Sequence, residues 1–62
     1  MISLYDIDGA EPVFVWTGAP EAFLADNDGN PDVEAAVAEC IAHGTATFNG
    51  GAGGRWLITR SA

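Results

Sequence analysis

The clearest pattern in the sequence is an apolar stripe at helical spacing between residues 30 and 44. The apolar side chains that recur three and four positions apart are Val33, Ala36, Val37, Cys40 and Ile41. Asn30 is a favourable N-cap, and Pro31 suits the first helical position because it has no amide hydrogen to satisfy. Gly44 can take the left-handed conformation that ends a helix. We therefore expect a helix over residues 31–43 whose stripe is buried.

Four other segments have the alternation or the β-branched and aromatic content of strands. They are residues 2–7, 12–17, 45–49 and 55–60. The dipeptides Asp8-Gly9 and Asn49-Gly50 are hairpin signals and join these segments in pairs. Residues 20–25 predict a short helical turn with Phe23 and Leu24 pointing inward.

The order of these elements is ββαββ, with the short turn placed before the main helix. It predicts an α+β fold: a small four-stranded, mainly antiparallel sheet with one main helix packed on one face. No linker or repeat interrupts the chain, so we expect residues 1–62 to form a single domain.

The predicted sheet has two apolar faces but only one covering helix. Strict alternation places Phe14 and Trp16 on the same face of the second strand, and Leu57 opposite Trp56 in the fourth. A solvated sheet face would be more polar. We expect the second face to be covered by residues 18–29, by a second copy of the chain or by a partner.

Charge is the outlying property of the chain. Nine acids face two arginines and no lysine, which gives a net charge of −7. Such a chain repels nucleic acid and anionic membranes, and attracts basic protein surfaces. Because 48% of the residues are hydrophobic, the sequence predicts a folded domain and not a disordered acidic tail.

Length and cysteine content point to a cytoplasmic protein. The chain has 62 residues beginning with Met, and we expect one small complete protein. One Cys allows no internal disulfide and fits a reducing compartment. The first residues lack the basic region of a signal peptide, and no apolar run approaches the roughly 20 residues of a membrane span.

Two loops resemble ligand-binding motifs, but their residues do not match the positions that these motifs require. Asp26, Asp28 and Gly29 resemble half of a calcium loop, yet Leu24 and Ala35 would then occupy ligand positions. The glycine-rich residues 50–54 join two strands and carry no lysine, unlike a phosphate-binding loop. We expect neither metal nor cofactor, although these glycines allow a partner backbone to approach closely.

Catalytic and base-stacking roles are also disfavoured. Cys40 and His43 could be a nucleophile and a base, but Cys40 lies in the apolar stripe and His43 at the helix end, where a capping role suffices. Two such residues are too few for a zinc site. Trp16 and Trp56 lack the basic surroundings of nucleic-acid binders, so we expect core or protein-interface roles. The chain is not expected to be an enzyme.

The acids are the remaining candidate site. Those expected to contact a partner are Asp26, Asp28, Asp32, Glu34 and Glu39. Asp32 and Glu39 are seven positions apart and share a helix face near Ala35. An array of carboxylates can imitate a row of phosphates and compete for lysines and arginines. The alternative interpretation is a solvated surface that only confers solubility.

In its small size, strong acidity and compactness, the chain resembles the phage-encoded anti-CRISPR proteins, although it shares no motif with them. The resemblance implies an inhibitor inside the host bacterial cell. Its partner would be a basic nucleic-acid-binding surface of a CRISPR effector complex, bound by DNA mimicry, with no direct nucleic-acid contact. Direct blocking and allosteric action both remain open, as do monomer and homodimer. The alternative function is a small homodimeric structural or assembly module of phage or bacterial origin.

Overall fold

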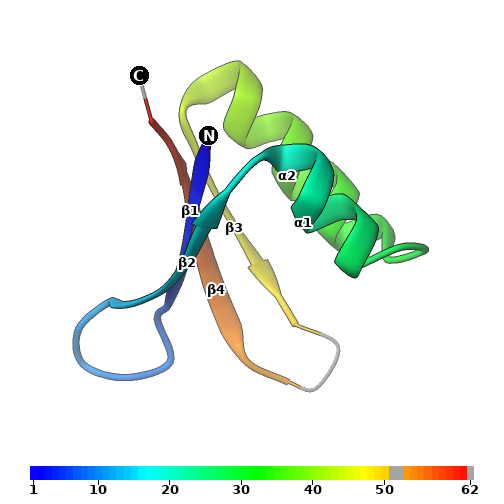
Figure 1. Ribbon diagram of the computed structural model, residues 1–62. Coiled ribbons are helices and arrows are strands. Elements are labelled where there is room, and N and C mark those ends of the chain that lie inside the picture. The colour runs from blue at the N-terminus through cyan, green and yellow to red at the C-terminus, as the bar shows by residue number, and fades with distance from the viewer. Residues whose placement is uncertain (51–52, 62) are drawn as a thin grey trace.

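A computed structural model describes residues 1–50 and 53–61 of the chain. Its elements are β1 (Ile2–Asp6), β2 (Val13–Gly18), α1 (Pro20–Asp26), α2 (Pro31–His43), β3 (Thr45–Asn49) and β4 (Arg55–Arg60) (Figure 1). The strands form one sheet in the order β2-β1-β4-β3, and all neighbours are antiparallel. The predicted α+β class and antiparallel sheet are confirmed, and the expected short turn is a seven-residue helix.

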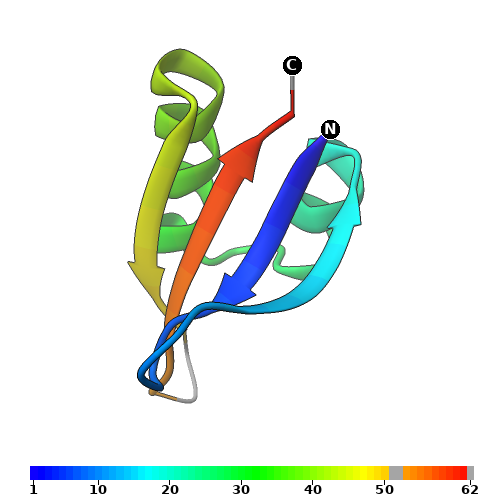
Figure 2. The same cartoon turned by 90° about the vertical axis from the view of Figure 1, so that its left-hand side faces the viewer.

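Two hairpins lie side by side, so the first and last strands meet at the centre of the sheet. β1 pairs with β4 from Ile2 opposite Arg60 to Asp6 opposite Trp56. Beyond the strands, the Ser61 amide donates to the Met1 carbonyl at 2.9 Å. Both helices cover one face of this sheet and leave the other face open (Figure 2).

The main helix has the predicted ends. The Asn30 side-chain oxygen accepts from the amides of Asp32 at 3.1 Å and Val33 at 3.4 Å. At the other end Gly44 is left-handed, with φ of 93°. The side chain that donates to a carbonyl of the last turn is Arg60, whose guanidinium bonds the Ile41 carbonyl. β4 thus supplies a cation where the negative end of the helix dipole lies.

The core lies between the sheet and the two helices. Its buried residues are Ile2, Phe23, Val33, Ala36, Val37, Cys40, Ala46 and Ile58. Trp16 closes one side of it, with its ring stacked on Phe23 at a centroid distance of 5.7 Å. The prediction that Ile41 is buried is wrong, since it is 48% exposed. Each four-residue step overshoots a full turn by about 40°, so the row that starts at Val33 drifts away from the sheet by Ile41.

A β-bulge corrects the predicted placement of the aromatic residues in β2. Leu4 pairs with Trp16 whereas the next residue, Tyr5, pairs with Phe14, which leaves Val15 unpaired. Trp16 therefore faces the core, and Phe14 faces the open side, where its ring meets Tyr5 edge-on at 5.8 Å. The prediction that Phe14 and Trp16 share a face is wrong, because one extra residue in a strand reverses the alternation beyond it.

The open face of the sheet consists of two long rows of cross-strand neighbours, with Asn49 and Arg55 beyond them at the end next to the second hairpin loop. We call the eight residues of the two rows the open sheet face: Thr17, Ser3, Thr59 and Thr45 in one row, and Phe14, Tyr5, Leu57 and Thr47 in the other. Residues 18–29 do not cover it, because α1 packs against α2 on the opposite side and buries Phe23 in the core. That segment is therefore excluded as the expected cover.

Candidate functional site

The helices carry most of the negative charge. We call the following exposed residues of the helices and their connecting loop the acidic helical layer: Glu21, Asp26, Asp28, Asp32, Glu34 and Glu39. The other three acids lie at or next to the hairpin turn between β1 and β2. The two arginines begin and end β4. One layer of the molecule is thus acidic, while the two rows of the open sheet face carry no charge and Arg55 lies at their end.

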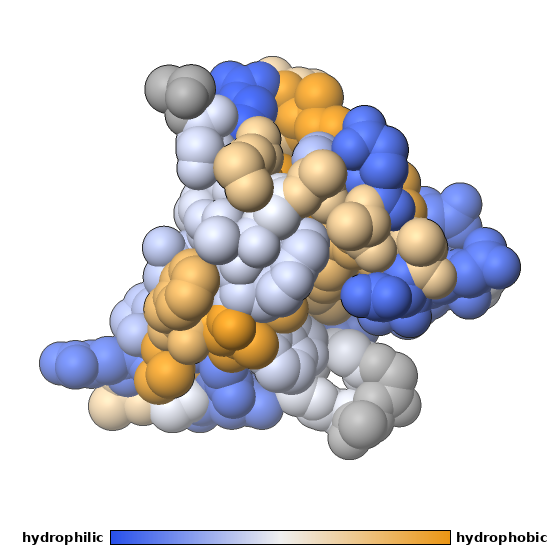
Figure 3. All heavy atoms as spheres, in the orientation of Figure 1, coloured by the Kyte–Doolittle hydropathy of each residue, from blue (hydrophilic) through white to orange (hydrophobic). Residues whose placement is uncertain are grey.

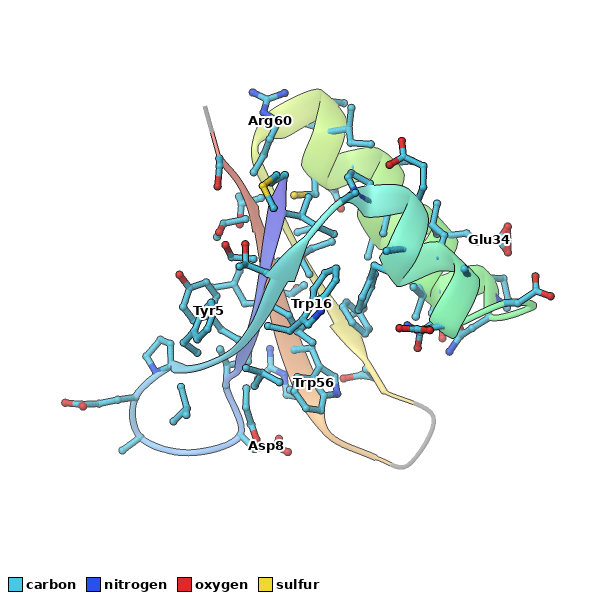
Figure 4. The ribbon with its side chains drawn as sticks, viewed as in Figure 1. Tyr5, Asp8, Trp16, Glu34, Trp56 and Arg60 are labelled. Carbon is cyan, nitrogen blue, oxygen red and sulfur yellow. The ribbon has the colours of Figure 1, made fainter. Side chains whose placement is uncertain are left out.

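The structure divides the predicted binding residues into three groups. Asp26 ends α1 and Asp28 lies in the loop that follows it. Glu34 points away from the sheet into solvent (Figure 4). Asp32 and Glu39 instead lie beside β3, two helical turns apart on α2. The predicted carboxylates are therefore all exposed, but only two of them line a concave surface.

That concave surface is a shallow groove of about 310 Å³ between α2 and the edge strand β3. We call it the α2–β3 groove; its lining residues are Asp32, Ala35, Ala36 and Glu39 from the helix, and Thr47, Phe48 and Asn49 from the strand. The expectation that Asp32, Ala35 and Glu39 share one helix face is confirmed. Sequence reasoning missed the strand side, since nothing in residues 45–49 indicates which strand ends the sheet.

A second hollow, of about 300 Å³, lies beside Trp56 and the start of α2. Its amide side chains already serve the fold. Asn27 donates to the Phe23 carbonyl at 2.9 Å, and Asn30 caps α2. Because these side-chain amides already form hydrogen bonds within the protein and no acid lines this hollow, it is a weaker candidate for a binding site than the α2–β3 groove.

Two of the remaining acids are structural. The Asp8 amide donates to the Asp6 carboxylate at 3.0 Å, and the Arg55 amide donates to the Asp8 carboxylate at 3.1 Å. These bonds connect the end of β1 to the start of β4. The Asp-x-Asp spacing after a strand is the local signal for such a turn. Asp8-Gly9 does belong to the connection between β1 and β2, but the loop spans residues 7–12 and is not a two-residue turn.

The Cys40–His43 pair has no nucleophile geometry. The Cys40 side chain is fully buried, whereas His43 is exposed at the last position of α2. Burial raises the pKa of the Cys40 thiol, and the nearby Arg60 charge opposes this only in part. A raised pKa keeps the thiol protonated, which is the reverse of activation. Within residues 1–50 and 53–61, no three His, Cys, Asp or Glu side chains are grouped to hold a metal.

The glycine-rich loop closes the second hairpin. The Gly50 amide donates to the Gly54 carbonyl at 2.7 Å, and the Gly53 amide to the Gly50 carbonyl at 3.0 Å. The expectation of a contact loop also falls on Gly51 and Ala52, which lie outside the described residues.

Neither of the two described helices has the length and apolar character needed to cross a membrane. No protein-family model, curated protein or solved structure matches the chain.

Proposed function

We propose that this protein is a non-enzymatic inhibitor that binds a basic, nucleic-acid-binding surface of another protein through its acidic helical layer. The observation that carries the proposal is the segregation of charge. Six exposed carboxylates occupy the helices and their loop, while no lysine exists and both arginines lie in β4. A solvated surface that served only solubility would need no such segregation.

The spacing of these carboxylates suits competition with a nucleic-acid backbone. α2 has 13 residues and is about 20 Å long, and its acids are distributed along that length. Exposed charges are screened over about 8 Å at physiological ionic strength, so each carboxylate acts mainly on the partner cations nearest to it, and the contact is distributed over several acids. A channel whose lysines and arginines bind phosphates would meet a row of negative charges here, at a lower density than the one charge per about 1.7 Å of a DNA duplex.

Size and acidity favour a particular class of target. The chain resembles anti-CRISPR proteins in these respects, and the proposed partner is the DNA- or RNA-binding channel of a bacterial CRISPR effector complex. The protein would act in the cytoplasm of the host cell as a DNA mimic. Binding would be stoichiometric and would involve no cofactor.

The test is displacement of labelled DNA from purified CRISPR effector complexes of several types. We expect the protein to displace DNA, and a variant combining Asp32→Asn, Glu34→Gln and Glu39→Gln to be at least about tenfold weaker. Added salt should weaken inhibition steeply, because the contact is electrostatic. Glu11→Gln, at the hairpin turn outside the helical layer, is the control for the loss of a single charge and is compared with Glu34→Gln alone. If the combined variant inhibits as well as the native chain, DNA mimicry is wrong.

The open sheet face favours a second candidate, a homodimeric assembly module. Phe14, on the edge strand β2 of this face, is 56% exposed, and Val13 and Val15 of the same strand are exposed as well, which gives an apolar patch over β2 (Figure 3). Two copies joined through this face, which has no carboxylate in its two rows, would keep their acidic helical layers on opposite sides of the dimer. Sedimentation should then show a salt-insensitive dimer that Phe14→Ser abolishes. A monomer at high concentration and high salt would exclude this module.

A further inference from the structure

We propose that the α2–β3 groove binds an extended basic segment of the partner protein, which adds to β3 as a fifth strand. The inference rests on the proposed function, since it assumes a basic protein partner, and it names the kind of segment that is bound. Three features of the groove support it: a free strand edge, a pair of carboxylates and a floor of small side chains.

The first feature is the edge of β3. This strand is last in the sheet order, so one of its sides has no neighbouring strand. Three consecutive residues line the groove: Thr47, Phe48 and Asn49. Successive side chains point to opposite faces of a sheet, so the surface these three share is the backbone edge. Such an edge presents unpaired N–H and C=O groups, with which an extended peptide can form a ladder.

The helix lies next to this edge because the connection is very short. Gly44 alone separates α2 from β3, and its left-handed conformation turns the chain back along the helix (Figure 1). α2 packs mainly on β3 and less on β4. The two edge strands, β2 and β3, carry no charged residue themselves, and β2 has exposed valines. The carboxylates beside the β3 edge are those of α2, Asp32 and Glu39.

The dimensions of helix and strand agree. Asp32 and Glu39 are seven residues apart, which corresponds to about 10.5 Å along a helix. The Cα atoms of Thr47 and Asn49 are two steps, or about 6.7 Å, apart, and the whole of β3 rises about 13 Å over its four steps. A peptide paired to β3 would therefore run past both carboxylates. Between them Ala35 presents only a methyl group, which leaves room for the aliphatic stems of lysine or arginine.

The chemistry of the groove selects the occupant. Main-chain bonds would provide affinity for any extended segment, and the two carboxylates would select lysine or arginine on the side that faces the helix. Acidic segments and nucleic acid would be repelled by the same carboxylates. We therefore assign the groove to lysine- or arginine-bearing strands or tails that border a nucleic-acid-binding surface.

The first experiment uses a short acetylated peptide in which lysine alternates with valine or threonine. Titration into the native protein, followed by amide NMR, should shift the signals of β3 and slow the hydrogen exchange of its edge amides. The same peptide with glutamate in place of lysine is the charge control. A third peptide, N-methylated at the amides that would face β3, should bind at least about tenfold more weakly. Absence of binding, or equal binding of all three peptides, would overturn the proposal.

The second experiment fills the groove. Ala35→Phe places a ring over the floor at an exposed position, and Ala38→Phe places the same ring elsewhere on the exposed surface of α2. Circular dichroism would establish that both variants are folded. We expect Ala35→Phe to reduce peptide affinity at least about tenfold and Ala38→Phe to leave it unchanged. Equal affinities for the two variants would contradict a bound peptide in the groove.

A third comparison separates this inference from the proposed function. The groove predicts that Glu39→Gln weakens binding more than Glu34→Gln, whereas a distributed acidic layer predicts similar losses. If the groove variants inhibit effector complexes normally while the combined acid variant fails, the groove is wrong and the inhibitor function stands. If the lysine peptide binds in the groove but no effector complex is inhibited, the inhibitor function is wrong and the groove stands.

Discussion

Cys40 illustrates how position decides the chemistry of a side chain in this molecule. Its sequence neighbours allow a nucleophile, but its place in the core cluster that also contains Ala46 and Ile58 of the sheet makes it a small apolar residue. Burial raises the pKa of the thiol because the thiolate would lose its hydration there. The nearby Arg60 guanidinium offsets only part of this effect.

We expect Cys40 to react with iodoacetamide much more slowly than the same thiol in denaturant. The unfolded thiol releases its proton before the folded one, so the free energy of unfolding should fall as pH rises past the ordinary value of 9.0. In the Cys40→Ala variant this part of the decrease at alkaline pH should be absent. At neutral pH its free energy of unfolding should be about 1 kcal/mol lower than that of the native chain. Thiol alkylation kinetics and melts across pH 7–11 measure both effects. Rapid alkylation of the folded protein would contradict the assignment.

Gly18 is required by the ring of Trp16. A Cβ at this position would lie 2.7 Å from Cη2 of that indole, which is held against Phe23. We expect Gly18→Ala to destabilise the protein by about 1–3 kcal/mol, because the indole must shift within the core. Gly9→Ala is the matched control, since a Cβ there would meet nothing within 4 Å. Thermal melts of the two variants test the difference, and equal melting temperatures would contradict it.

At the scale of elements, the helices and hairpins could be predicted because their signals are local. α2 begins and ends at the predicted residues, since Asn30, Pro31 and Gly44 each act within one turn. The bulge at Val15 could not be predicted, because it exists only in register with β1. The α2–β3 groove depends on which strand ends the sheet. The sequence predicted that Asp32, Ala35 and Glu39 share one helix face, but it did not predict that residues 47–49 would lie beside them.

The N-cap of α2 offers a test at this scale. Asn30→Ala removes the acceptor of two backbone amides, and we expect a loss of about 1 kcal/mol. Asn30→Ser should retain most of the stability, because serine is also a favourable N-cap. Denaturant titrations of the two variants provide the comparison. If alanine and serine give the same midpoint, the side-chain cap contributes nothing measurable.

At the scale of the whole molecule, the charge that would serve binding opposes folding. Carboxylates crowded on one layer repel one another, and Glu39 also lies in the half of α2 near its negative pole. We expect moderate salt to raise the melting temperature of the native chain. Glu39→Gln should raise it slightly at low salt while weakening partner binding. Calorimetry at two salt concentrations tests this, and a lower melting temperature of Glu39→Gln at low salt would argue against the trade-off.

The central pairing of the first and last strands also determines how the chain reaches its fold. β1 and β4 are neighbours in the sheet but are separated by nearly the whole sequence. Either hairpin can form early, yet the sheet is completed only when the two ends of the chain meet, and such distant contacts slow folding. During synthesis β1 must wait for β4, with its inner edge unpaired and open to other chains. A circular permutant that joins the adjacent ends through a short linker, and opens the chain between Asp28 and Gly29 in the loop that connects α1 to α2, would place the strands along the chain in the order β3-β4-β1-β2. Every strand would then follow its neighbour in the sheet. The permutant should therefore fold faster than the native order in stopped-flow measurements.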